Sequence, residues 1–158
     1  MITAHLPSGY VLACAGRQSD PLIVGACVLG AVFPDFDLIW FFFVDDRAFH
    51  HHRYWVHAPG FWAMVAVPVS CIAIFLKARL RRVVAWFMAA WMLHLCLDTI
   101  VGDIMWQWPF SDRLFHLATV TPTDHHYVVT FMLHWSFLIE IAIWILAITL
   151  FLKRKSNV

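Results

Sequence analysis

The chain has 158 residues and a formal net charge of +1, with 62% hydrophobic and 13% charged side chains. Soluble domains are usually about 45–50% apolar and about 25% charged, so a water-soluble domain of this length could not bury so much apolar surface. The near-zero net charge gives no support for a nucleic-acid partner. The composition therefore predicts a single membrane-embedded domain over residues 1–158, with an all-α fold.

The first third of the chain contains short apolar runs rather than full-length spans. Residues 10–15 and 21–33 are apolar and flank a polar turn, and residues 38–44 are very hydrophobic but short. A helix needs roughly 20 apolar residues to cross the hydrocarbon core. We therefore expect short or half-inserted N-terminal helices, with residues 38–44 at the interface or continuing a bent element.

Three later segments are predicted to span the membrane. Residues 58–76 form an apolar run without a charge, and residues 83–101 are long enough when the polar end of the segment is included. Residues 127–152 are longer and contain only His134 and Glu140 as ionisable groups, which permits a tilted crossing. The sequence thus predicts a polytopic helical bundle with three clear spans.

Basic side chains set the predicted orientation. One group lies within residues 77–82, between two predicted spans, and another lies within residues 153–155, after the last span. Two crossings separate the groups, so both lie on one side, which the positive-inside rule makes cytoplasmic. The C-terminus is then cytoplasmic, and residues 50–57 and 98–126 face outward. We expect the polar residues after position 33 to reach the same outer face.

Two carboxylates follow the apolar run that Pro34 helps to terminate. Asp35 and Asp37 stand at positions i and i+2, so both can reach one ion. Two neighbouring carboxylates repel each other unless a cation or an arginine compensates. The competing interpretation is a polar cap that ends a membrane segment.

Four imidazoles fall within eight residues, at His50, His51, His52 and His57. Neutral imidazole is the commonest metal ligand, and packing does not explain so dense a run beside a membrane segment. Arg53 follows directly and can bind a phosphate or carboxylate through two hydrogen bonds. The alternative is a solvated loop at the interface.

His94 and Asp98 stand at positions i and i+4, so both project from one face of a helix. An aspartate in a span costs about 2.5–3.5 kcal/mol on insertion scales and therefore requires a partner. The pair can bind one ion, or Asp98 can orient His94; the alternative is a packed core histidine. His5 could complete a coordination shell. Capping or solvation is the preferred interpretation for the remaining outer residues, which are Asp112, His116, Thr123, Asp124, His125 and His126.

Five pieces of the sequence, in this order, carry a family resemblance: Thr3-Ala4-His5, Gly30-x-x-x-Pro34-Asp35-x-Asp37, His52-Arg53-x-x-x-His57, His94-x-x-x-Asp98 and Pro109-Phe110-Ser111-Asp112-Arg113. Together they resemble the YdjM-like family of inner-membrane metal-dependent hydrolases. The resemblance implies a membrane-embedded hydrolase whose metal ligands come from His5, Asp35, Asp37, His52, His57, His94 and Asp98. The sequence departs from the family at Tyr54, where glycine is common, and at Val56-His57-Ala58, where Thr-His-Ser is common. The Pro-Asp and His-x-x-x-Asp pieces are also similar, more distantly, to zinc-dependent phospholipase C, which implies a cluster of metal ions.

The leading hypothesis is a metal-dependent hydrolase in the inner (plasma) membrane. A site of imidazoles and carboxylates suits zinc, with manganese or iron as alternatives, and such an ion activates water and polarises a phosphoryl or acyl oxygen. We expect Arg53 to bind the anionic group of the substrate and His51 to move a proton. The expected substrate is a lipid or lipid-linked ester that diffuses to the outer interface.

Two other hypotheses belong to different classes. A metal-ion transporter or metal-handling membrane protein would carry ionisable side chains along its spans as a relay. A structural or assembly factor would bind no ion. The sequence leaves the oligomeric state open.

Overall fold

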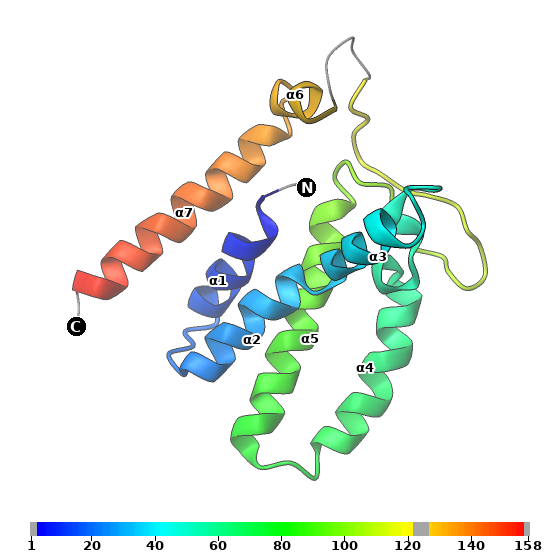
Figure 1. Cartoon of the computed structure of the whole chain (residues 1–158). Coiled ribbons are helices and arrows are strands. Elements are labelled where there is room, and N and C mark those ends of the chain that lie inside the picture. The colour runs from blue at the N-terminus through cyan, green and yellow to red at the C-terminus, as the bar shows by residue number, and fades with distance from the viewer. Residues whose placement is uncertain (1–2, 122–126, 157–158) are drawn as a thin grey trace.

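The computed structural model describes residues 3–121 and 127–156 of the chain, and within them the fold is all-helical (Figure 1). Seven α-helices and three short 3-10 helices follow one another in this order: α1 (His5–Ala15), α2 (Pro21–Val32), η1 (Pro34–Phe36), α3 (Asp37–Phe43), η2 (His51–Arg53), η3 (Trp55–His57), α4 (Pro59–Ala73), α5 (Ala78–Asp98), α6 (Tyr127–Met132) and α7 (Phe137–Ser156). The predicted all-α fold class is confirmed.

Helix α5 is the central element of the fold. It packs against α2, α1 and α4, while α7 packs against α1 on the far side of the molecule (Figure 1). The core between α1, α2 and α5 is built largely from small side chains, including Ala13, Cys27, Ala31 and Ala90, all fully buried. Small residues let the helix backbones approach closely, which is the usual basis of packing between membrane helices.

Gly30 marks a close approach of α2 to α5. A Cβ atom at Gly30 would lie 2.4 Å from the Phe87 carbonyl oxygen, whereas a Cβ at Gly25 would meet no atom within 4 Å. We expect Gly30→Ala to destabilise the protein by about 1–3 kcal/mol, because overpacking forces the backbones apart. Gly25→Ala is the matched control and should be neutral or stabilising, because glycine is a poor helix former. Thermal unfolding in detergent measures both; equal midpoints would contradict this account of the packing.

Within the described residues, one helix is long and apolar enough to cross a membrane. This helix is α5, with 21 residues. The bent pair formed by α2 and the segment Pro34–Phe43 is also long and apolar enough to cross a membrane when its two parts are counted together. These two parts meet at an angle of 55°. The pair agrees with the expected bent element in this region, because Pro34 lacks the amide that would continue α2.

The three predicted spans are therefore not confirmed as a set. Helix α4 has 15 residues and contains Pro68, so it is shorter than the predicted segment 58–76. The segment 127–152 is not one helix, because α6 ends at Met132 and α7 begins at Phe137. A turn in which Ser136 Oγ lies 2.8 Å from His134 Nδ1 separates the two helices.

The polar segments gather at one end of the bundle and the basic turn before α5 lies at the other (Figure 1). At the basic end, Arg79 donates two hydrogen bonds to Asp20, from Nε at 2.7 Å and from Nη2 at 2.8 Å. The Arg79 guanidinium lowers the pKa of Asp20 to about 2. This contact joins the start of α2 to the start of α5, so both helices lead from one end of the bundle to the other.

Candidate functional site

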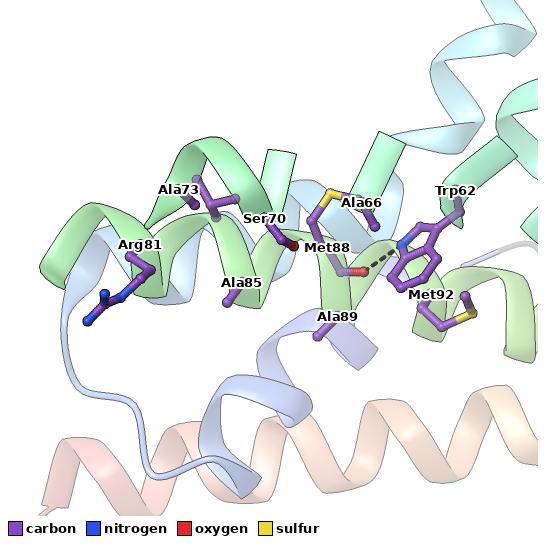
Figure 2. A pocket seen from close by; sticks show the side chains of 10 residues that line it. Trp62, Ala66, Ser70, Ala73, Arg81, Ala85, Met88, Ala89 and Met92 are labelled. Atoms are coloured by element: carbon purple, nitrogen blue, oxygen red, sulfur yellow. Dashed lines mark hydrogen bonds between the residues drawn. The ribbon is translucent and has the colours of Figure 1, made fainter. Parts of the chain in front are cut away.

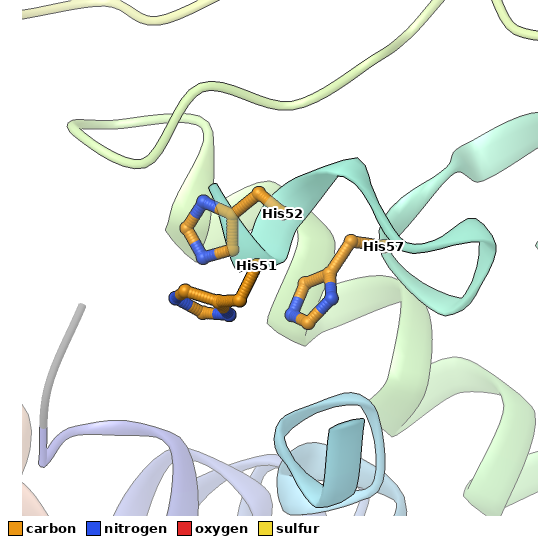
Figure 3. A group of neighbouring side chains, drawn as sticks. All are labelled: His51, His52 and His57. Carbon is orange, nitrogen blue, oxygen red and sulfur yellow. The ribbon is translucent and has the colours of Figure 1, made fainter. Parts of the chain in front are cut away.

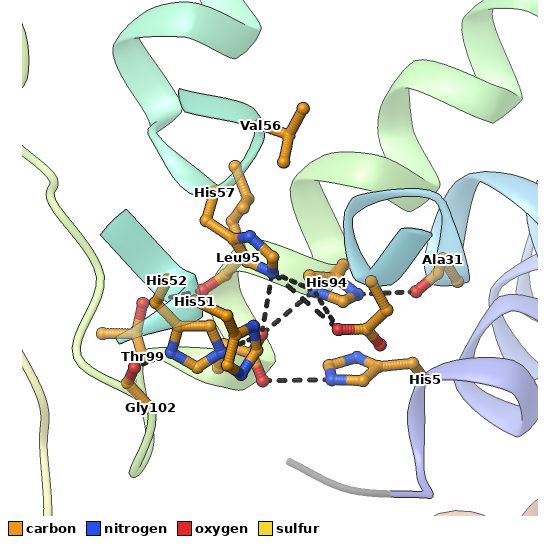
Figure 4. A network of polar contacts seen from close by, with 12 residues as sticks. His5, Ala31, His51, His52, Val56, His57, His94, Leu95, Thr99 and Gly102 are labelled. Atoms are coloured by element: carbon orange, nitrogen blue, oxygen red, sulfur yellow. Dashed lines mark hydrogen bonds and ion pairs between the residues drawn. The ribbon is translucent and has the colours of Figure 1, made fainter. Parts of the chain in front are cut away.

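Six elements bring imidazoles and carboxylates together at the polar end (Figure 4). The contributing residues are His5 from α1, Asp35 from η1, Asp37 from the start of α3, His51 and His52 from η2, His57 from η3, and His94 and Asp98 from the end of α5. The expected meeting of the Pro-Asp-x-Asp carboxylates with the histidine-rich loop is therefore present in the structure. The break at Pro34 turns the chain so that both aspartates reach this cluster.

One group within the cluster has the geometry of a metal site. Asp35, His57, His94 and Asp98 each offer one ligand atom, and these four atoms lie within 4.8 Å of one another. His94 Nε2 lies 3.0 Å from Asp98 Oδ2, 3.3 Å from His57 Nε2 and 3.8 Å from Asp35 Oδ1. A tetrahedral zinc ion with bonds of about 2.0–2.1 Å separates its ligand atoms by about 3.3 Å. The four donors thus fit one ion, and we name them the central donor group.

Backbone carbonyls hold two of the imidazoles with one ring nitrogen free for a ligand. His94 Nδ1 donates to the Ala31 carbonyl at 2.8 Å, and His52 Nδ1 donates to the Gly102 carbonyl. Each hydrogen bond fixes the tautomer, so the Nε2 lone pair of both rings is turned toward the carboxylates. His52 Nε2 accordingly lies 3.4 Å from Asp98 Oδ2.

Asp37 and His5 contact members of the central donor group through atoms that do not face the other donors. Asp37 Oδ2 lies 2.8 Å from His57 Nδ1, on the opposite side of the ring from the Nε2 that faces Asp35. His5 Nε2 lies 3.0 Å from Asp98 Oδ1, and the His5 ring stacks on the His94 ring with centroids 3.8 Å apart. Both residues were predicted as ligands, and this geometry also suits them to orienting the residues that they touch.

A second group of donors shares a residue with the first. His51, His52 and His57 each offer a ring nitrogen, and these three atoms lie within 4.8 Å of one another (Figure 3). His51 Nδ1 also lies 3.7 Å from Asp37 Oδ1. The sequence assigned His51 a proton-shuttle role, and the structure makes it a candidate ligand as well. We name these three histidines the loop donor group.

Burial and charge favour a cation in this cluster. The side chains of His57, His94 and Asp98 are no more than 1% exposed, whereas those of Asp35 and His51 are 27% and 23% exposed and form its opening. The Asp35 and Asp37 carboxylates outweigh the effect of burial and raise the pKa of His57 to about 9. The raised pKa of His57 reflects an excess of negative charge around its imidazole. A metal ion would also neutralise that charge.

Burial has the opposite effect on His52, since it lowers the pKa of this imidazole well below its ordinary value. A neutral imidazole keeps the lone pair that a metal requires. The donor set of neutral imidazole and ionised carboxylate is the one that zinc and similar divalent ions bind in proteins.

Other polar residues singled out in the sequence lie outside the cluster. Arg53 is exposed on η2. Glu140 is buried on α7, where it accepts hydrogen bonds from Thr3 N at 2.8 Å and from Thr3 Oγ1 at 2.6 Å. His116 contacts Asp103 in the loop after α5. The predicted capping and solvated residues Thr123, Asp124, His125 and His126 lie outside the described residues.

Sequence reasoning missed the two carbonyls that orient the imidazoles. Both belong to positions where the backbone approaches closely: Ala31 lies in the small-residue interface of α2 with α5, and a Cβ at Gly102 would lie 2.5 Å from His52 Cε1. The signal available in the sequence was the small size of these residues beside polar motifs. Their partners could not be read from the sequence, because the contacts join positions 50 and 63 residues apart.

Fold and site together define an all-helical protein with a candidate membrane span and a buried histidine–aspartate cluster that can hold a metal ion. The family model described as YdjM inner membrane protein matches residues 1–156, so the chain belongs to this family. The resemblance seen in the sequence is confirmed. No curated protein and no solved structure matches the chain, and the more distant similarity to phospholipase C is not shown.

Proposed function

We propose that this protein is a membrane-bound, metal-dependent hydrolase that cleaves a lipid or lipid-linked ester at the outer face of the inner membrane. The observation that carries the proposal is the central donor group, in which imidazole and carboxylate atoms converge at distances of 3.0–3.9 Å. Burying carboxylates is costly unless positive charge compensates them. A bound divalent cation supplies that charge.

Each residue of the cluster receives a role from its contacts. The central donor group would hold the ion, with zinc favoured and manganese or iron as alternatives. Such an ion lowers the pKa of water and polarises a phosphoryl or acyl oxygen. Asp37 orients His57, and His5 orients Asp98.

Two further residues act on the substrate side of the cluster. His51 lies at the opening, where its imidazole can accept a proton from water and return it to the leaving group. Arg53 is exposed on the same short helix and can bind an anionic group of the substrate through two hydrogen bonds.

The surface beside the opening supports a lipid as the substrate. Helix α3 begins two residues after Asp35, and most of its apolar side chains are exposed, with Trp40 at 58% and Phe43 at 83%. A substrate that arrives from the bilayer would meet this apolar surface before it reaches the polar cluster. The positive-inside rule supports a multi-pass topology with the C-terminus in the cytoplasm and the cluster facing outward.

Turnover of a lipid panel tests the proposed function. Purified wild type in nanodiscs should release product from one phospholipid or lipid-linked ester, lose activity after chelation and regain it when zinc is added back. His94→Ala should be inactive under all three conditions, because it removes a central ligand. His116→Ala is the matched control, since His116 pairs with Asp103 outside the cluster, and it should behave as wild type.

Two outcomes would count against metal-dependent hydrolysis at this cluster. Turnover that survives both chelation and His94→Ala would separate activity from the cluster. Zinc flux into proteoliposomes without lipid turnover would favour the competing proposal of a metal transporter.

A further inference from the structure

A groove of about 580 Å³ runs between α4 and α5, within the range of about 300–1,000 Å³ typical of ligand pockets (Figure 2). Small side chains leave this space open: Ala66 and Ala73 on α4, and Ala85 and Ala89 on α5. Asp98 follows Ala89 by nine residues, or two and a half turns at 3.6 residues per turn, so the two side chains project from opposite sides of α5. The groove therefore lies on a different face of α5 from the histidine–aspartate cluster.

The groove has the length of one leaflet of a bilayer. Along α5 it extends from Arg81 to Met92, which at 1.5 Å per residue is about 16 Å. Half of a hydrocarbon core of about 30 Å is about 15 Å. A single acyl chain entering from one surface would thus fill the groove to the bilayer midplane.

The two ends of the groove differ in chemistry. At the end beside the basic turn stands Arg81, whose side chain is exposed and has no ion-pair partner among residues 3–121 and 127–156. Its neighbour Arg79 is occupied by Asp20. At the other end, Trp62 Nε1 donates a hydrogen bond to the Met88 carbonyl at 2.9 Å (Figure 2). The indole therefore satisfies this backbone acceptor, and the end of the groove is apolar.

We propose that this groove binds an anionic phospholipid from the leaflet beside the basic turn, with one acyl chain between α4 and α5 and the phosphate against the Arg81 guanidinium. Arginine pairs with phosphate through charge-assisted hydrogen bonds, and basic residues at a membrane surface attract anionic lipids. A helix from a second copy would instead cover Arg81 with apolar surface, which is costly for a charged group. The lipid site is independent of the proposed hydrolysis.

Native mass spectrometry tests the lipid site. Wild type is released from nanodiscs of equal parts phosphatidylcholine and phosphatidylglycerol, and we expect one phosphatidylglycerol to remain bound. Arg81→Gln should weaken retention about fivefold, the fold-change that corresponds to roughly 1 kcal/mol per basic side chain at an anionic surface. Ala85→Leu with Ala89→Leu should abolish retention, because the leucines fill the groove.

The matched controls are residues that do not line the groove. Arg82→Gln removes the same charge from the same turn, and Ala63→Leu with Ala142→Leu adds the same volume at exposed positions elsewhere. Both controls should retain the lipid as wild type does. Equal retention in all variants would overturn the proposal, as would a lipid-free dimer that the groove-filling variant dissociates.

Discussion

Asp98→Asn is expected to weaken zinc binding by more than about 100-fold, beyond the 10–100-fold loss typical of residues that only orient a ligand. The Asp98 carboxylate contacts several imidazoles of the cluster at once: Oδ2 lies 3.0 Å from His94 Nε2 and 3.4 Å from His52 Nε2, while Oδ1 contacts His5. An amide has the same shape but no charge, and its NH2 group cannot bind a metal. Zinc titration of the purified protein by calorimetry measures the change.

Asp112→Asn is the matched control for this substitution, because Asp112 is an exposed carboxylate in the loop after α5. It should bind zinc as wild type does. Helix content by circular dichroism should be equal in the three proteins, since asparagine fills the same volume. Wild-type affinity in a folded Asp98→Asn protein would rule out Asp98 as a ligand.

His57→Ala is expected to eliminate stoichiometric metal, whichever donor group holds the ion. His57 belongs both to the central donor group and to the loop donor group, and its ring is fully buried between Asp35 and Asp37. Its removal leaves either group one donor short and brings the carboxylates into uncompensated repulsion. Elemental analysis of protein purified in detergent measures the ratio of metal to protein.

His51→Ala separates the two groups in the same experiment. His51 belongs to the loop donor group alone, so its loss should leave the metal of the central donor group in place. An unchanged metal ratio in His57→Ala would contradict both assignments. A loss of metal in His51→Ala as complete as that in His57→Ala would transfer the main site to the loop.

The fold could be predicted where composition decides it. The all-α class follows from the apolar content, and α5 (Ala78–Asp98) overlaps the predicted segment 83–101. The segment 127–152 is not confirmed as one span, because hydropathy alone does not show that the turn around His134 and Ser136 interrupts the helix. Pro68 and the early end of α4 likewise depend on local backbone geometry rather than on apolar content.

The candidate site could be predicted as a set of residues but not as an arrangement. Asp35 stood out because a second carboxylate follows it at i+2, His57 because four imidazoles fall within eight residues, and Asp98 because an aspartate in a span requires a partner. That His57 would lie between two aspartates, and that carbonyls of Ala31 and Gly102 would orient the other imidazoles, depends on tertiary contacts between distant positions. Residue types therefore indicated a candidate metal site, and only the fold shows which donor atoms converge and which side chains contact those donors from outside the group.

The order in which these residues occur along the chain bears on how the protein is made. Every donor of the cluster lies between His5 and Asp98, whereas α7 contributes Glu140, which accepts hydrogen bonds from Thr3 near the start of α1. A nascent chain therefore carries the complete donor set as soon as α5 has left the ribosome. These donors can then assemble before α7 packs against α1.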